Sequence, residues 1–233
     1  MKAAVHRADS RGGADHGWLK TRHSFSFANW HDPERDGFGA LRVLNDDVIA
    51  PHQGFGAHPH RDFEIVTIVT RGAVTHEDGL GTRAKVAAGE VQVMSAGTGV
   101  VHSEKNEEDE PLELFQLWIV PKERGVAPRY DRKRFDEASR KNALQLLVSD
   151  TGEDGSLMIR QDARIYLADL AAGAEIPYQL PPGRGAYVFV VEGEVKIGEV
   201  LLKRRDALAV SDSSSFSITP VTAANILVID VPV

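Results

Sequence analysis

The chain has 233 residues, of which 42% are hydrophobic and 26% are charged, and this balance excludes disordered and fibrous proteins. Its net charge of −7 argues against a general nucleic-acid binder, because the phosphate backbone would repel it. The chain contains neither an apolar run long enough to span a membrane nor any cysteine, so a bound metal would need nitrogen and oxygen ligands.

The N-terminal segment begins with MKAAVHRADSRGG, which lacks the apolar core of a secretory signal, so we expect a cytoplasmic protein. The part that follows is rich in imidazole and indole groups, at His16, Trp18, His23, Trp30 and His31. These side chains either line the mouth of a pocket or make structural hydrogen bonds, and the residues alone leave both interpretations open.

Short apolar segments rich in valine and isoleucine, divided by glycine and proline, indicate an all-β fold. The spacing of apolar residues in 129–148 favours either a short helix or an irregular connection. Helices are therefore expected to contribute little. In chain order, the expected strands are 42–49, 63–69, 84–94, 112–120, 187–197, 207–212, 215–219 and 225–231.

Two parts of the chain resemble each other. Residues 68–76 and 189–197 each predict a strand, a tight turn at a glycine and a second strand. Two copies of one β unit predict two tandem jelly-roll-like β-barrels. The basic, proline-containing stretch 121–135 is then the expected connection. We expect an N-terminal metal-binding domain at 1–130 and a C-terminal domain without metal ligands at 131–233.

Two pairs of potential metal ligands occur in strand-like segments of the first copy: His58 with His60, and His102 with Glu104. Because side chains alternate along a strand, each pair shares one face. If both strands face one barrel interior, the four groups converge, and imidazole with carboxylate suits first-row transition metals. The competing interpretation is coincidence among nine histidines.

The second copy lacks a comparable ligand set. All nine histidines lie at or before residue 102. The positions that match the four candidate ligands fall near Gln179, Pro181, Ile218 and Pro220, which form no plausible metal site. We therefore expect one metal ion per chain.

These motifs carry a family resemblance. HPHRDFEIVTIVTRG, GEVQVMSAGTGVVHSE and the earlier HGWLKTRHSFSFANWHDPERDGFGALRVLNDDVI resemble the pirin family, a bicupin group of the cupin superfamily. The resemblance implies two tandem cupin barrels. It also implies a single iron in the N-terminal barrel, held by His58, His60, His102 and Glu104, and no metal in the C-terminal barrel.

The choice of carboxylate needs an argument, since the general cupin pattern takes its carboxylate from the region after the first histidine pair. Glu64 stands in that region. Seven residues separate Glu64 from Gly72, whereas the general cupin pattern has six. Gly97 also stands where that pattern has a proline. Both departures fit pirins. We therefore expect Glu104 to be the ligand and Glu64 to support the site or the fold.

The resemblance implies an activity as well. Some pirins are quercetin 2,3-dioxygenases, oxidoreductases that use dioxygen to open the central ring of a flavonol and release carbon monoxide. Glu104 would then be the catalytic base. Ferrous iron is the expected metal, although copper, nickel, zinc or manganese can occupy the same ligands. The alternatives are an iron-containing regulatory or redox-sensing protein that binds a transcription factor or metabolic enzyme, and a catalytically silent cupin.

Overall fold

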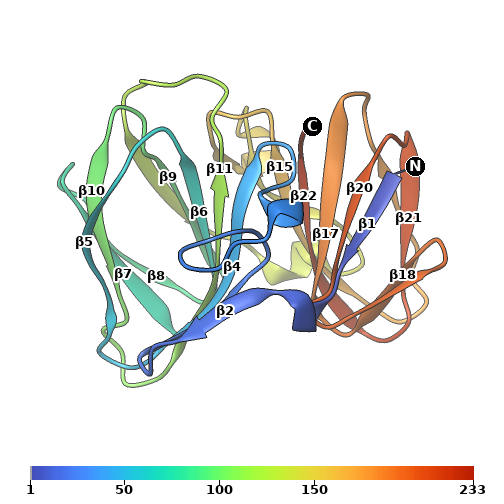
Figure 1. Ribbon diagram of the computed structural model, residues 1–233, viewed down its shortest axis with the longest axis horizontal. Helices are drawn as coiled ribbons and strands as arrows, with labels where there is room; N and C mark the ends of the chain where they lie inside the picture. Colours follow the sequence, from blue (N-terminus) through green and yellow to red (C-terminus); the bar gives the residue numbers. More distant parts are fainter. Residues whose placement is uncertain (1) are drawn as a thin grey trace.

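Two β-barrels lie side by side in the computed structural model, which describes residues 2–233 (Figure 1). Each barrel combines a seven-stranded sheet with a four-stranded sheet. The helices in the described residues are short 3-10 turns, and none has the length and apolar character that crossing a bilayer would require. The all-β prediction with two barrels is confirmed. The turns are η1 (Ala8–Ser10), η2 (Pro33–Arg35), η3 (Glu137–Arg140) and η4 (Glu153–Gly155).

The N-terminal barrel holds both pairs of candidate ligands. Its seven-stranded sheet has the order β12 (Arg129–Arg134), β9 (Glu90–Ser95), β6 (Glu64–Arg71), β11 (Leu112–Ile119), β4 (Leu41–Ile49), β3 (Leu19–His23) and β2 (Gly12–Asp15). Its four-stranded sheet has the order β5 (Gly54–His60), β10 (Val100–Lys105), β7 (Ala73–Asp78) and β8 (Arg83–Ala87).

The C-terminal barrel repeats this plan. Its seven-stranded sheet has the order β1 (Lys2–His6), β20 (Ala207–Ser211), β17 (Arg184–Glu192), β22 (Ala224–Pro232), β15 (Arg164–Leu170), β13 (Gln145–Ser149) and β14 (Leu157–Met158). Its four-stranded sheet has the order β16 (Ile176–Gln179), β21 (Ser215–Pro220), β18 (Glu194–Ile197) and β19 (Val200–Lys203).

The repeat in the sequence corresponds to the same connection between the two sheets in each barrel. The chain passes from β6 to β7 at Gly72 with a φ of 69°, and from β17 to β18 at Gly193 with a φ of 84°. Glycine adopts this left-handed conformation without the steric cost that a Cβ imposes. A Cβ at Gly193 would also lie 2.2 Å from the Ala223 carbonyl oxygen. Both conditions make glycine necessary there.

Residues 129–148 form no α-helix. They contain β12, the single turn η3 and the start of β13, because β12 pairs along its length with β9 of the N-terminal sheet. At the other end of the chain, the dark blue strand β1 lies in the C-terminal barrel, where it pairs with β20 (Figure 1). We keep 1–130 and 131–233 as proposed domain bounds, with β1 lying in the C-terminal barrel and residues 131–134 of β12 lying in the N-terminal barrel.

The barrels pack through their seven-stranded sheets and differ in their interiors. A shared apolar core joins the sheets, with Phe115 of β11 and Phe189 of β17 in edge-to-face contact at a centroid distance of 5.6 Å. The interior of the C-terminal barrel is filled by buried apolar side chains that include Ile176, Tyr178 and Ile218. Imidazole, amide and carboxylate groups occupy the matching space of the N-terminal barrel, where the site lies.

Candidate metal centre

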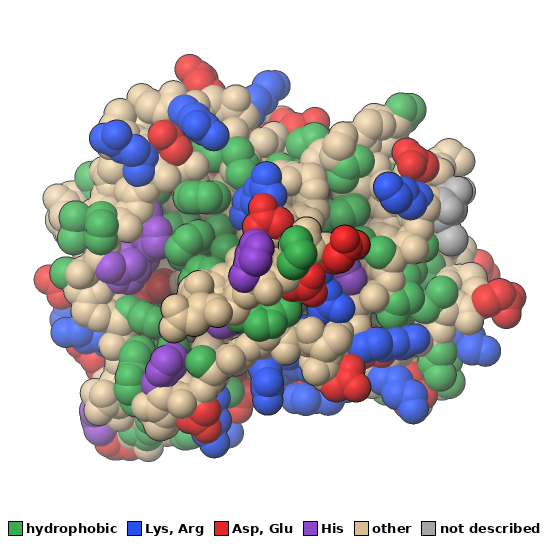
Figure 2. Space-filling view, viewed as in Figure 1, with side chains coloured by type: hydrophobic (Ala, Val, Ile, Leu, Met, Phe, Trp, Pro, Cys, Tyr) green, Lys and Arg blue, Asp and Glu red, His purple; other side chains and the backbone are tan. Residues whose placement is uncertain are grey.

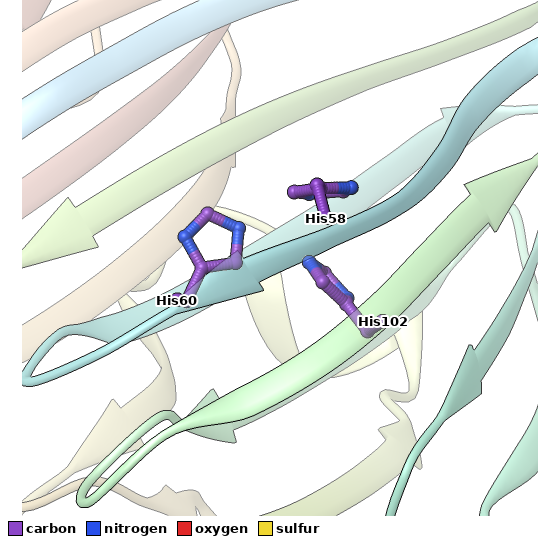
Figure 3. A group of neighbouring side chains, drawn as sticks. All are labelled: His58, His60 and His102. Carbon is purple, nitrogen blue, oxygen red and sulfur yellow. The ribbon is translucent and has the colours of Figure 1, made fainter.

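Three histidines meet across β5 and β10. These strands pair antiparallel, with His102 opposite His58 and Val100 opposite His60. One ring nitrogen from each of the three histidines lies within 4.8 Å of the others, and Figure 3 shows the rings turned toward one another. Metal–nitrogen bonds of about 2.1 Å hold ligand atoms at most about 4.2 Å apart. Only a small contraction would bring the three nitrogens onto one ion.

A β-bulge shapes β5 beside the histidines. His102 pairs with His58 and Glu104 pairs with Phe55, so β5 spans three residues where β10 spans two. Bulges of this kind re-aim side chains and occur beside active sites. Across the bulge, the His58 Nδ1 lies 2.8 Å from the Gly56 carbonyl oxygen and donates to it. That bond leaves the His58 Nε2 lone pair free to bind a metal.

A hydrogen-bonded chain fixes the protonation of His102. The His76 Nε2 lies 2.9 Å from an Asp78 carboxylate oxygen and donates to it, which leaves the His76 Nδ1 as an acceptor. The His102 Nδ1 lies 3.3 Å from that atom and donates to it. The His102 Nε2 is then an unprotonated acceptor, and it is buried without a hydrogen-bond partner among residues 2–233. Such an orphaned lone pair fits a metal ligand.

Burial keeps the imidazoles of His60 and His102 neutral. Burial, together with the neighbouring His58, lowers the pKa of His60 to about 4. Burial and the surrounding histidines lower the pKa of His102 to about 3. Burial opposes ionisation of Asp78, but hydrogen bonds from His76 and from backbone amides outweigh it and lower the pKa of this carboxyl. His60 and His102 thus present neutral nitrogen donors, and a charged carboxylate lies behind His102.

Glu104 belongs to a second group of potential ligands that shares His102 with the first. Its carboxylate falls within 4.8 Å of His76 and His102 nitrogens. The Gln92 side chain donates to one carboxylate oxygen and the Gln116 side chain donates to the other, each at 2.7 Å. The structure therefore brings Glu104 beside the three-histidine group, and its role as fourth ligand remains our proposal.

Glu64 lies outside both groups of potential ligands in the described part of the chain. It is buried, it accepts a hydrogen bond of 2.7 Å from the Ser95 hydroxyl, and burial raises the pKa of its carboxyl. These contacts are those of a structural residue, which agrees with the choice of Glu104 over Glu64.

A cavity of about 590 Å³ opens onto the histidines. Its lining includes His58, His60 and Glu104 at one end, and its walls carry the rings of Trp18, Phe27, Trp30, Phe55 and Trp118. Figure 2 shows histidine and apolar side chains gathered on the N-terminal half of the molecule, where the surface is hollowed. This volume lies within the range of ~300–1,000 Å³ that is usual for small-molecule sites.

Comparisons with known proteins decide the family. Residues 4–119 match the family model described as Pirin, and residues 146–231 match the one described as Quercetinase C-terminal cupin domain. The quercetin 2,3-dioxygenase of Escherichia coli K12 is 45% identical over 229 residues, covering 98% of this chain and 98% of that protein. A Pirin-like protein of Caulobacter vibrioides is 45% identical over 223 residues, covering 95% and 96%. The chain belongs to the pirin family.

Solved pirin structures share the whole fold. Escherichia coli YhhW superposes with a TM-score of 0.96 at 44% identity, covering 99% of this chain and 98% of that chain. The same bacterial pirin in complex with nickel(II) superposes with a TM-score of 0.94 at 44% identity, covering 99% of each chain. The predicted membership of the pirin family, with two cupin barrels, is confirmed. A relative that binds a divalent metal agrees with the neutral nitrogen donors found in this pirin.

Several functional contacts of this pirin escaped the sequence analysis. The sequence does contain a signal for the three side chains that donate hydrogen bonds to Glu104. These polar residues interrupt otherwise apolar strands at inward-facing positions: Thr67, Gln92 and Gln116. His76 gives no such signal, since its neighbours in sequence are polar. Of the N-terminal side chains, His16, Trp18, His23 and Trp30 line the cavity, as the pocket interpretation predicts. His31 is exposed and is not part of that lining.

Proposed function

We propose that this pirin is a metal-dependent dioxygenase that opens the central ring of flavonols such as quercetin and releases carbon monoxide. The observation that carries the proposal is the three-histidine group, two of whose members, His58 and His60, line a cavity walled by aromatic rings. Relatives named quercetin 2,3-dioxygenase support it. The shape and chemistry of the cavity support the substrate class.

The cavity walls suit a flat polycyclic aromatic molecule. The Trp118 ring lies between the His60 and Phe27 rings, at centroid distances of 4.8 Å and 5.4 Å. On the opposite flank, Trp18 and Phe55 pack edge to face at 5.3 Å. Aromatic side chains bury large areas and prefer offset or edge-to-face contacts with other rings. They would orient the substrate and exclude water from its reacting end.

The metal would be held by His58, His60, His102 and Glu104. The donor set fits, since nitrogen and carboxylate ligands with open positions are typical of ferrous oxygenases. When bound, ferrous iron would supply Lewis acidity toward a substrate oxygen and reactivity toward dioxygen. Nickel, copper, zinc and manganese can compete for the same donors, so iron is the part of the proposal that metal analysis must decide.

Glu104 is the best-placed base for the flavonol 3-hydroxyl. Its carboxylate lines the cavity beside His58 and His60, and it is buried. The Gln92 and Gln116 amides each donate to one carboxylate oxygen, which fixes the orientation of the carboxylate. A carboxylate oxygen can still accept the hydroxyl proton, because each oxygen carries two lone pairs.

The cavity also favours catalysis over a purely regulatory role. A redox-sensing iron site can be almost closed, whereas a dioxygenase needs an apolar passage from solvent to the metal. His58 and His60 are only half-buried, and both face the open, aromatic-lined cavity. A sensor that acts on a transcription factor or metabolic enzyme has no need of such a passage.

Turnover of quercetin by iron-loaded protein tests the proposal. The protein would be stripped of metal, reloaded anaerobically with ferrous iron and mixed with quercetin and air, while flavonol absorbance and carbon monoxide are followed. We expect iron-dependent loss of quercetin with release of carbon monoxide. His58→Ala and Glu104→Gln should lower kcat/KM by at least about 100-fold, through loss of a ligand and of a positioned base.

The matched control is His52→Ala, because His52 is exposed, pairs with Asp109 and lies outside the cavity lining. It should retain full activity. Stoichiometric iron binding by the unmodified protein without any loss of quercetin would contradict the proposal.

A further inference from the structure

A cluster of polar side chains lies in the cavity wall formed by β3 and β4. It consists of Thr21, His23, Asn45 and Asp47, which we call the polar wall; all four line the cavity. The two strands pair with Thr21 opposite Asp47 and His23 opposite Asn45. Alternation along each strand therefore points the four side chains to the same face, which is the interior of the N-terminal barrel.

The polar wall continues a row of polar residues across the sheet. Asn45 pairs with Gln116 of β11, Gln116 pairs with Thr67 of β6, and Thr67 pairs with Gln92 of β9. Gln116, Thr67 and Gln92 all donate hydrogen bonds to the Glu104 carboxylate. One half of the row thus serves Glu104, and the other half faces the cavity without a comparable task.

Buried polar atoms of the polar wall have no protein partner. The residues are only 6% (Thr21), 3% (His23), 4% (Asn45) and 5% (Asp47) exposed. Within residues 2–233, no hydrogen-bond partner contacts the Thr21 hydroxyl, either ring nitrogen of His23, the Asn45 side-chain oxygen or the Asp47 Oδ1. Leaving such groups unsatisfied destabilises a folded protein. A ligand in the cavity can satisfy them.

The chemistry of these atoms selects the ligand group. The Asn45 oxygen is an acceptor, and the Thr21 hydroxyl can also accept. Burial raises the pKa of the Asp47 carboxyl to about 7, and in either protonation state this carboxyl keeps an oxygen that accepts. Burial, reinforced by the charge of Arg11, lowers the pKa of His23 to about 4, so its ring stays neutral and keeps one accepting nitrogen. A wall rich in acceptors is complementary to a ligand edge that carries hydrogen-bond donors.

We propose that the polar wall is a substrate subsite that accepts hydrogen bonds from hydroxyl groups on an outer ring of the substrate. The inference rests on the proposed flavonol activity and narrows it to polyhydroxylated flavonols. Here Asn45, Asp47, Thr21 and His23 are specificity-determining residues, because they contact a part of the substrate that does not react.

A run of aromatic contacts links His23 of the polar wall to the histidine group. The His23 ring contacts Phe27 at a centroid distance of 5.1 Å, Phe27 contacts Trp118 at 5.4 Å, and Trp118 contacts His60 at 4.8 Å. Phe27 and Trp118 thus form a continuous aromatic wall between His23 and His60. A three-ring substrate lying along them would reach the metal with its central ring and the wall with an outer ring.

Anaerobic calorimetry with two flavonols tests this subsite without requiring turnover. Quercetin carries hydroxyls on both outer rings, whereas 3-hydroxyflavone has the same reacting group and none on the outer rings. We expect the unmodified protein to bind quercetin at least about tenfold more tightly. Asn45→Leu, which removes an unpartnered acceptor at similar volume, should weaken quercetin binding about tenfold and leave 3-hydroxyflavone unchanged.

Thr21→Val is a second, isosteric variant, which keeps the test valid if Asn45→Leu fails to fold. It should also reduce the preference for quercetin over 3-hydroxyflavone. Equal binding of both flavonols by the unmodified protein would overturn the subsite, as would variants that weaken both ligands alike. Preferential quercetin binding without any turnover would instead support the subsite and contradict the proposed dioxygenase activity.

Discussion

At the scale of single residues, the protonation of His102 depends on a neighbour that makes no direct metal contact in our account. Both ring nitrogens of His76 are engaged, one with Asp78 and one with His102, and the His76 ring also stacks on Tyr130 at 4.4 Å. The His102 Nε2 is available to a metal because the ring proton sits on His102 Nδ1, which donates a hydrogen bond to the His76 Nδ1. Carboxylate–histidine pairs of this kind orient ligands in many metal sites.

Replacing His76 should therefore weaken metal binding without removing a ligand. His76→Gln loses the fixed acceptor for His102, and we expect the affinity for ferrous iron or nickel to fall about 10- to 100-fold. Competition with a chromophoric chelator measures the change, with His52→Gln as the exposed control. Unchanged affinity in His76→Gln would show that the hydrogen-bonded chain has no part in positioning the ligand.

At the scale of elements, runs of valine and isoleucine bounded by turn residues predicted the strands that pack into the cores. β4, β6, β11 and β22 fall within a few residues of their expected positions because valine and isoleucine recur along them. β12 was missed: its exposed, basic residues have no apolar periodicity, and its strand conformation comes from pairing with β9. Pairing partners far away in sequence cannot be seen in local composition.

The same limit applies to the candidate site. The i, i+2 spacing predicted that His58 shares a face with His60 and that His102 shares a face with Glu104, and the buried sides of the strands agree. The bulge in β5 and the approach of His76 from β7 depend on strand register, which the sequence does not encode locally. The supporting groups around Glu104 were missed for that reason.

At the scale of the whole molecule, β1 ties the two barrels together, and a half-buried histidine, His6, lies at the junction. The His6 Nδ1 accepts a hydrogen bond of 3.0 Å from the Tyr187 hydroxyl, and its ring contacts Phe25. Burial, reinforced by the charge of Arg35, lowers the pKa of His6 to about 4. In the unfolded chain, the pKa of this imidazole returns to about 6.5.

The depressed pKa of His6 predicts acid destabilisation. Between pH 6.5 and 4 the unfolded chain binds the proton and the folded protein does not, so stability is complete above about pH 6.5 and falls toward pH 4. Between pH 6.5 and 4, the free energy of unfolding of His6→Gln should fall by about 1–2 kcal/mol less than that of the unmodified protein, after allowance for partial solvent exposure. Urea unfolding at pH 7.5 and 4.5 measures this, and equal losses would exclude the role of His6.

The position of the metal tests the account most directly. Crystals of protein loaded with ferrous iron, measured at the iron absorption edge, would locate the ion by its anomalous scattering. The account predicts one peak per chain, within bonding distance of nitrogens of His58, His60 and His102 and of a Glu104 oxygen. A peak held instead by His76, His102 and Glu104, or no peak in the N-terminal barrel, would contradict it.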